Sequence, residues 1–289
     1  MISQLHSAVI DVADFEAGAN DYARLLGHAP RWIETNDAAG TRSAHFPLAN
    51  MRLEVRGATS ARDPLTNGLS GLRLQCDDLD RAVERLEARG ISAKQSVAEE
   101  ATGRDGETLR QWRSIGIDTK SSRGLPVELV SDEVLSGAAA AEGDPSNRAN
   151  FRGGGASVDP ASAVRALDHV VVFSADADTT RDFYGDGLGI RLALDRSFEN
   201  RGVRLLFFRV GGTTIEIGSR LGAEPKSDEQ DRFGGLAWQV PDIDAIRSRL
   251  LADGFDVSEI RDGNKPGTRV CTARDPVHEV PTLLIEPVS

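Results

Sequence analysis

The sequence predicts an α+β fold made of four strand–helix–three-strand units, arranged two to a domain. Three observations lead to this prediction. The same order of elements returns four times along the 289 residues, and an internal repeat of this kind defines the architecture. The chain is long for a single core. A Gly-rich stretch without hydrophobic alternation divides it near the middle.

The first unit begins with residues 4–12, which alternate apolar and polar side chains as a strand does. Residues 15–26 carry apolar side chains at helical spacing, and Gly27 follows as a helix C-cap. Three short strands complete the unit, at residues 31–34, 42–48 and 51–55.

The second unit repeats this order from Gly71. Residues 71–76 form its first strand, and the acidic run at 77–80 supplies a helix N-cap and first-turn charges. The helix is expected over residues 81–88, before Gly90. Its remaining strands are expected at residues 92–97, 109–117 and 125–130.

Residues 133–163 are small, polar and Gly-rich, and they are interpreted as an interdomain linker. The predicted domains are therefore residues 1–132 and residues 164–289. One unit alone leaves the apolar face of its sheet uncovered, so two units should pair within each domain.

The third unit starts with an apolar strand at residues 167–173 and a helix that ends at residues 187–189. Three strands follow, the last at residues 213–217. The fourth unit has a strand from Gly235, a helix at residues 243–252, and strands near residues 255–260, 269–273 and 282–285.

Composition excludes several classes of protein. Lys and Arg number 34 against 45 Asp and Glu, a net charge of −11, and no basic stripe indicates a nucleic-acid partner. Cys76 and Cys271 lie far apart and suggest reduced thiols. The sequence shows no signal-peptide pattern and no apolar run near the roughly 20 residues that span a bilayer. These features predict a cytoplasmic protein without membrane contact.

Two histidines and two glutamates recur at matching positions of the repeat. His6 and His169 lie on first strands, and Glu54 and Glu216 follow them by 48 and 47 residues at the ends of fourth strands. If each sheet curls around a cavity, strand alternation turns these side chains inward, where they can hold a metal ion. The alternative is structural: partly buried histidines, and glutamates in surface ion pairs.

The organisation resembles the vicinal oxygen chelate superfamily, which includes glyoxalase I, methylmalonyl-CoA epimerase, extradiol dioxygenases and bleomycin-resistance proteins. LDHVVVFSADADTTRDFYGDGLGI, residues 167–190, is similar to the family's opening strand and helix, and RSAHFPLANMRLEV, residues 42–55, to its third and fourth strands. The resemblance covers almost the whole chain outside the linker. It implies curled mixed sheets around clefts, but it does not specify the reaction.

The resemblance also implies where a divalent metal would bind. The matching positions are His6, Glu54, Gly71 and Glu128 in the first half, and His169, Glu216, Gly235 and Leu283 in the second. His6, Glu54 and Glu128 form a set that suits Zn, Mn, Ni or Fe(II). The second half retains only His169 and Glu216, unless crossed pairing of the units joins these two to Glu128.

Four further residues are candidates for binding substrate. Arg73 and Gln75 share the inward face of the strand that begins at Gly71, and Gln239 repeats Gln75 in the second half. Either glutamine would donate a hydrogen bond or act as a weak metal ligand, or would be a polar residue at a sheet edge. Arg123 lies in a loop that resembles a substrate-contacting loop of epimerase-like members, although a solvated loop is the more common interpretation of such a segment.

The leading functional hypothesis is a metal-dependent lyase or isomerase that acts on a small oxygenated substrate. The metal would polarise a carbonyl, and Glu128 or Glu54 would move the adjacent proton. The first half is favoured as the active one. The alternative is a metal-free binding or sequestration protein of the bleomycin-resistance type. Gly235 and Leu283 disfavour an extradiol dioxygenase. A homodimer is one possible assembly.

Overall fold

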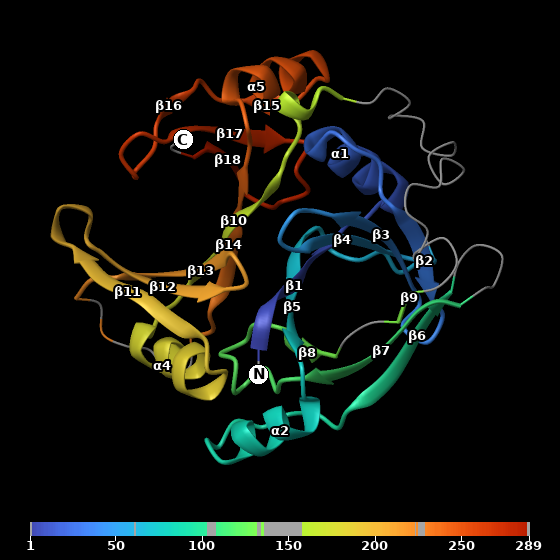
Figure 1. Ribbon diagram of the computed structural model, residues 1–289, viewed down its shortest axis with the longest axis vertical. Coiled ribbons are helices and arrows are strands. Elements are labelled where there is room, and N and C mark those ends of the chain that lie inside the picture. Colours follow the sequence, from blue (N-terminus) through green and yellow to red (C-terminus); the bar gives the residue numbers. More distant parts are fainter. Residues whose placement is uncertain are drawn as a thin grey trace.

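The computed structural model describes residues 2–60, 62–102, 108–131, 134–135, 158–222, 224 and 229–287. Most of the predicted linker lies outside these residues. The chain forms two large sheets, one from each half of the sequence, which lie side by side (Figure 1).

The first sheet closes on itself. Its strands are β1 (Ile2–Asp11), β2 (Trp32–Asn36), β3 (Thr41–Pro47), β4 (Arg52–Ala58), β5 (Gly68–Cys76), β6 (Val97–Thr102), β7 (Thr108–Gly116), β8 (Val127–Val130) and β9 (Val134–Leu135). They run in the order β6-β2-β3-β4-β1-β5-β8-β7-β9. Because β6 pairs with β7 and also with β2, where Thr35 lies opposite Thr102, the sheet forms a ring. One face of its strands therefore points into an enclosed interior.

The second sheet stays open. Its strands are β10 (Ala166–Phe173), β11 (Arg191–Phe198), β12 (Val203–Val210), β13 (Thr213–Arg220), β14 (Arg232–Gln239), β15 (Asp256–Val257), β16 (Arg261–Asp262), β17 (Arg269–Asp275) and β18 (Thr282–Glu286). They run in the order β11-β12-β13-β10-β14-β18-β17-β15, with β16 beside β17. Within the described residues, β11 does not pair with β15 or β16. The inner face of this sheet is not enclosed.

In the described residues each unit contributes one α-helix, and an aspartate caps the N-terminus of each of these helices. The helices are α1 (Phe15–Leu26), α2 (Leu79–Glu87), α4 (Ala177–Asp182) and α5 (Ile243–Ala252), and a π-helical turn, Phe183–Gly187, follows α4. Asp14, Asp78, Asp176 and Asp242 each accept a backbone N–H of the first turn. The cap at Asp78 starts α2 two residues before the predicted position. Short 3₁₀ turns lie at Pro160–Ser162 and Glu199–Arg201.

The pairing of the strands shows which units form each sheet. β1 of the first unit pairs with β5 of the second, and β10 of the third pairs with β14 of the fourth. Crossed pairing is therefore not how the sheets form. The strand expected at residues 92–97 is wrong, because β6 begins at Val97.

The two sheets share one hydrophobic core between their outer faces. Leu53, Leu74 and Leu129 from the ring pack in the same cluster as Ile215 and Trp238 from the open sheet. Polar contacts add to this packing: the Asn50 amide donates to the Leu167 carbonyl at 2.8 Å. The division into separate domains at residues 132 and 164 stays a prediction.

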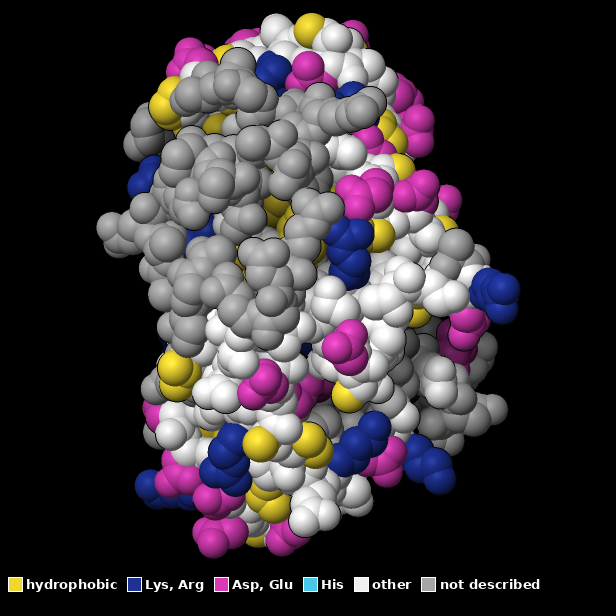
Figure 2. Space-filling view, turned by 90° about the vertical axis from the view of Figure 1, so that its right-hand side faces the viewer, with side chains coloured by type: hydrophobic (Ala, Val, Ile, Leu, Met, Phe, Trp, Pro, Cys, Tyr) yellow, Lys and Arg dark blue, Asp and Glu magenta, His cyan; other side chains and the backbone are white. Residues whose placement is uncertain are grey.

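The surface carries both signs of charge. On the face in Figure 2, Lys and Arg side chains are interspersed with Asp and Glu among the described residues. No helix in the described part of the chain is long and apolar enough to cross a bilayer.

Candidate active site

The predicted metal position in the first half holds an arginine. The Arg73 guanidinium lies between the two predicted carboxylate ligands: its Nε donates to Glu128 Oε2 at 2.9 Å, and its Nη1 pairs closely with Glu54 Oε2. The Glu54 side chain is 2% exposed, and Ser43 Oγ also donates to it at 2.9 Å. The positive charge that a metal would supply here comes from the protein itself.

The protonation of this cluster follows from its charges. Burial by itself would raise the pKa of Glu54, but Arg73, His45 and Arg110 outweigh burial and hold it well below its usual range. Burial lowers the pKa of Arg73, but Glu54 and Glu128 more than reverse this effect and raise it. Glu54 and Arg73 are therefore a charged, buried pair, and Glu54 is not an available base.

His6 does not join the two glutamates. Its Nδ1 lies 3.1 Å from Ser7 Oγ, and its Nε2 lies 3.4 Å from Nη2 of Arg52. A second cation thus faces the nitrogen that was predicted to bind a metal. The donor set His6, Glu54 and Glu128 does not fit a divalent ion while Arg73 and Arg52 occupy these positions.

The rest of the ring interior is a second buried ion-pair cluster around Glu34. His45 Nε2 lies 2.9 Å from Glu34 Oε1, and Trp32 and Arg110 donate to Glu34 Oε2 at 3.1 and 3.2 Å. Burial raises the pKa of Glu34, but His45 and Arg110 outweigh it and lower the pKa to about 2. The ring of the first half thus carries buried ion pairs of its own around Glu54 and Glu34. The hypothesis that the first half is the active one is not supported by this geometry.

The open sheet presents a different arrangement around His169. Asp168 Oδ1 accepts a hydrogen bond from His169 Nδ1 at 2.8 Å, and Gln239 Nε2 donates to the other Asp168 oxygen at 2.9 Å. His169 Nε2 lies 3.9 Å from Glu216 Oε2. The side chains of His169 and Glu216 are 16% and 21% exposed, so solvent reaches this group.

The Asp168 carboxylate fixes the histidine tautomer. Its pKa is lowered chiefly by the hydrogen bond from His169, against burial, and further by Gln239. An ionised Asp168 on Nδ1 keeps the proton on that nitrogen and leaves the Nε2 lone pair toward Glu216. Arg209 stands near this group from β12 and donates to Thr214 Oγ1 at 2.7 Å. The site thus contains a base, a carboxylate and a nearby cation.

Asp168 was not predicted, for a structural reason. Alternation along a regular strand would place Asp168 on the face opposite His169. The pairing of β10 with β14 shifts register between Leu167 and His169, and this bulge brings both side chains to one group. The adjacent Asp168 and His169 at the start of the strand were the only feature of the sequence that could have indicated this hydrogen-bonded pair.

The third and fourth predicted ligand positions of the second half supply no donor. At Gly235 the backbone has φ of 136°, and an added Cβ would lie 2.3 Å from the Pro281 carbonyl oxygen, so a histidine does not fit. Leu283 packs against the apolar cluster of Ala237, Val270 and Ile285. In the described residues, no three His, Cys, Asp or Glu side chains are grouped to hold a metal ion. His169 and Glu216 remain as a pair of potential ligands.

The other predicted substrate-binding residues lie elsewhere. Gln75 is buried on β5 inside the ring, beside Val130 of β8. Arg123 joins the two halves: its Nε donates to Asp231 Oδ1 at 3.1 Å and its Nη2 to the Glu229 carbonyl at 3.0 Å. Of the predicted set, the structure thus brings together two separate groups: Arg73 with Glu54 and Glu128 in the ring, and His169 with Glu216 and, through Asp168, Gln239 on the open sheet.

Comparisons with known proteins agree with this fold. Residues 168–272 match the family model described as the glyoxalase/bleomycin resistance protein/dioxygenase superfamily. Among solved structures, a triple mutant of 4-hydroxymandelate synthase from Streptomyces coelicolor is 18% identical, with a TM-score of 0.67 over 99% of this chain and 92% of that one. A halotolerant catechol dioxygenase is 13% identical, with a TM-score of 0.60 over 99% and 87%.

A smaller protein covers only part of the chain. Methylmalonyl-CoA epimerase from Mycobacterium tuberculosis is 25% identical over 44% of this chain and 90% of its own, with a TM-score of 0.37. No curated protein sequence is significantly similar to the chain. The similarity to the two longer structures concerns the fold. The whole chain thus shares the two-sheet fold of these structures, and within it residues 168–272 match the glyoxalase/bleomycin resistance protein/dioxygenase superfamily.

Proposed function

We propose that the chain is a lyase or isomerase that transfers a proton next to a carbonyl of a small oxygenated substrate, with its active site on the open sheet of the second half. The observation that carries this proposal is the hydrogen bond of 2.8 Å between Asp168 and His169 Nδ1, which leaves Nε2 as the nitrogen that faces Glu216, on a side chain that is 16% exposed. A histidine held in this way is a general base.

Three side chains have distinct roles in the proposed step. His169 Nε2 takes a proton from the carbon next to the substrate carbonyl, and Asp168 stabilises the imidazolium that forms. Arg209, exposed on β12, faces the negative charge that develops on the carbonyl oxygen. In an isomerase the proton returns to another face or another carbon, and in a lyase a leaving group departs from the neighbouring carbon.

The predicted divalent metal, whether Zn, Mn, Ni or Fe(II), is not part of this mechanism. The first half holds Arg73 between Glu54 and Glu128, and the described residues of the second half offer only His169 Nε2 and Glu216 Oε2. Two protein donors are fewer than the three that catalytic metal sites use. The residues therefore do not fit a resident metal, and no step depends on one.

A metal-free binding protein is the second candidate function. The observation that favours it is the apolar character of exposed residues at the open sheet: Phe173 is 42% exposed, Leu192 36% and Leu194 45%. Such residues would bind an apolar ligand beside the polar group at His169. The two candidates share a site and differ in whether His169 moves a proton.

The test separates turnover from binding. The protein is incubated in D₂O with pyruvate, 2-oxobutyrate and acetoacetate, and loss of the signals from protons next to the carbonyl is followed by ¹H NMR. We expect exchange above the buffer rate, reduced about 100-fold or more in His169→Gln. His6→Gln is the matched control, because His6 lies in the ring of the first half, and it should keep the wild-type rate.

A second measurement does not depend on the choice of substrate. The chain has five histidines, so ¹⁵N NMR signals can be assigned with single variants. We expect neutral His169 to carry its proton on Nδ1, and Asp168→Asn to change this tautomer balance. A wild-type His169 protonated on Nε2 would contradict the proposed base, whatever the exchange assay shows.

A further inference from the structure

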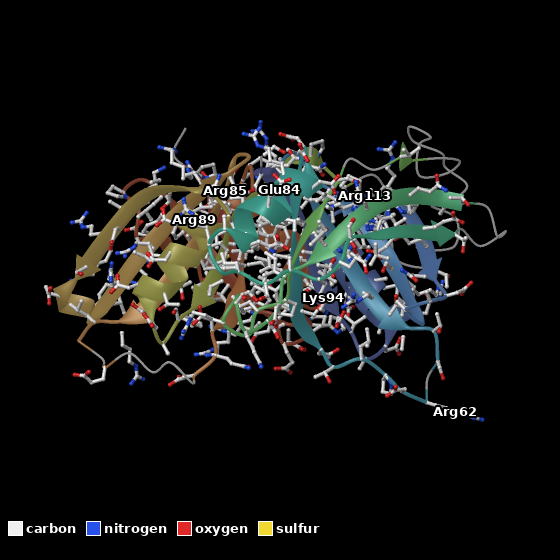
Figure 3. The ribbon with its side chains drawn as sticks, turned by 90° about the horizontal axis from the view of Figure 1, so that it is seen from below. Arg62, Glu84, Arg85, Arg89, Lys94 and Arg113 are labelled. Atoms are coloured by element: carbon white, nitrogen blue, oxygen red, sulfur yellow. The ribbon has the colours of Figure 1, made fainter. Side chains whose placement is uncertain are left out.

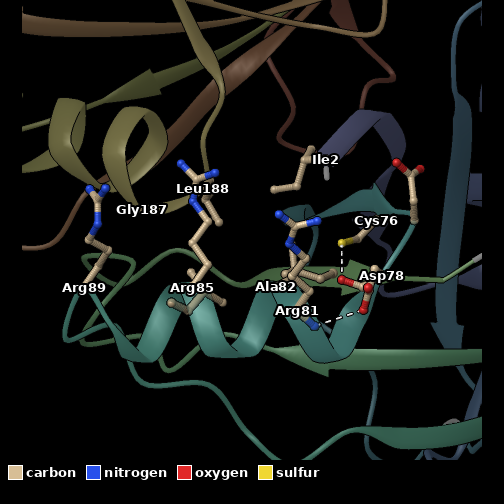
Figure 4. A pocket seen from close by; sticks show the side chains of 12 residues that line it. Ile2, Cys76, Asp78, Arg81, Ala82, Arg85, Arg89, Gly187 and Leu188 are labelled. Atoms are coloured by element: carbon tan, nitrogen blue, oxygen red, sulfur yellow. Dashed lines mark hydrogen bonds between the residues drawn. The ribbon is translucent and has the colours of Figure 1, made fainter.

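A cavity of about 710 Å³ lies where the two halves meet, between α2 and the turn Phe183–Gly187 (Figure 4). Its volume is in the range of small-molecule sites. Asp168, His169 and Glu216 are not among its lining residues. This cavity, called here the arginine cavity, is therefore separate from the proposed active site.

Three arginines line the arginine cavity. Arg81 and Arg85 lie one turn apart on one face of α2, with a rise of about 6 Å between them, and Arg89 lies in the turn that follows the helix. Figure 4 shows Arg81 and Arg85 extending from α2 toward the cavity and Arg89 extending from the end of this segment, and Figure 3 shows Arg85 and Arg89 from below. All three residues are exposed.

These charges are not neutralised by ion pairs. Within the described part of the chain, no carboxylate forms a salt bridge with Arg81, Arg85 or Arg89. Asp78 lines one end of the cavity, but its carboxylate accepts the backbone N–H of Arg81 as the helix cap. The like charges of Arg81 and Arg85, one helical turn apart, repel each other. An anion in the cavity would remove this repulsion, in a protein whose net charge is −11.

Arg85 also connects the two sides of the cavity. Its Nη2 donates to the Asp186 carbonyl across the boundary between the halves at 3.2 Å. Its guanidinium lies over Gly189, where φ is 74° and an added Cβ would be 2.7 Å from Arg85 Cζ. The glycine leaves room for the arginine, and the contact links α2 to the second half.

The remaining lining is largely apolar. Leu86, Leu129 and Leu188 line the arginine cavity together with Ile2 and Ala82, and Asp77 lies beside Asp78 at its edge. An inorganic anion would leave this surface without a partner, whereas a ligand with an apolar portion would cover it. The lining thus combines a row of guanidinium groups with an apolar wall.

We propose that the arginine cavity is a binding site for an organic phosphate that carries an apolar group. Guanidinium groups bind phosphate oxygens through paired, charge-assisted hydrogen bonds, and Arg81 and Arg89 have donors available for such bonds. The apolar group of the ligand packs against Leu86 and Leu188. This site is additional to the proposed proton-transfer site.

Isothermal titration calorimetry with octyl phosphate tests the proposal. The variant Arg81→Gln/Arg89→Gln removes two charges but keeps Arg85 and its contact with Asp186. We expect its affinity for octyl phosphate to fall about tenfold or more. Arg62→Gln/Arg191→Gln is the charge-matched control, since both residues are exposed and outside the cavity lining, and its affinity should stay within about twofold of wild type.

Two further ligands and one variant separate the outcomes. Octanoate and inorganic phosphate should each bind at least about tenfold more weakly than octyl phosphate, because each lacks one part of the recognised chemistry. His169→Gln should bind octyl phosphate as the wild type does, so the result is independent of the proposed activity. Equal affinity of the two double variants, or no saturable binding to the wild type at millimolar concentrations, would overturn the proposal.

Discussion

The two halves of this chain place a histidine and a glutamate at matching positions but surround them differently. In the ring, Glu54 is 2% exposed and pairs with Arg73, and His6 faces Arg52. In the open sheet, Glu216 is 21% exposed and lies 3.9 Å from His169, which Asp168 orients. The comparison teaches that a repeated residue pair acquires its chemistry from its neighbours and from solvent access.

The largest expected effect tests which half is active. His169→Gln should reduce proton exchange by about 100- to 10,000-fold, because it removes the general base. Glu128→Gln should keep activity, because Glu128 forms an ion pair with Arg73 in the ring and does not contact His169. Exchange rates by ¹H NMR measure both variants. Loss of activity in Glu128→Gln with an intact fold would place the active site in the ring of the first half and contradict the proposal for the open sheet.

The next effect concerns the stability of the ring. Arg73→Met should lower the free energy of unfolding by about 3–5 kcal/mol, because it leaves Glu54 charged and buried without its partner. Urea unfolding at pH 7, followed by circular dichroism, measures the change. Arg209→Met on the open sheet is the matched control, and it should cost about 1 kcal/mol or less because Arg209 is exposed. Similar losses in both variants would mean that the ring interior is no more dependent on its charges than the open sheet.

The ring should also make the protein sensitive to acid. The pKa of Glu34 is about 2 in the folded chain and near 4.5 when unperturbed, so the unfolded state binds the proton more readily. Its contribution, on the order of 3 kcal/mol, is complete above the ordinary pKa and is lost as pH falls from about 5 to 2. Urea unfolding across this range should show a smaller pH dependence in Glu34→Gln. An unchanged slope in that variant would place the acid-sensitive group elsewhere.

The smallest effect tests the missing ligands of the open sheet. Leu283→Glu places a carboxylate on β18, beside Ala237 and in line with His169 across β14. We expect Zn²⁺ to bind about 10- to 100-fold more tightly than to wild type, and this gain to vanish when His169→Ala is added. Calorimetric titration of Zn²⁺ measures the change. Tight binding by the wild type that His169→Ala removes would show that two protein ligands suffice here.

The candidate site was predicted only in part. His169, Glu216 and Gln239 were found from their spacing in the repeat, because β-strand alternation carries over from one unit to the next. Asp168 was missed because a bulge changes the face of a side chain without leaving a mark in the sequence. Arg73 was assigned to substrate, because alternation shows that a side chain points inward but not what fills the interior.

The four units, their helices and the positions of the paired His and Glu residues could be predicted from the sequence alone. These features depend on local periodicity and on helix capping, which involve residues that are close together in the sequence. Only the tertiary structure decided that the first sheet closes through the pairing of Thr35 with Thr102, while the second stays open. That pairing joins residues far apart in sequence. It seals Glu54 beside Arg73 and leaves His169 within reach of solvent, because burial and charge pairing are properties of the assembled sheets.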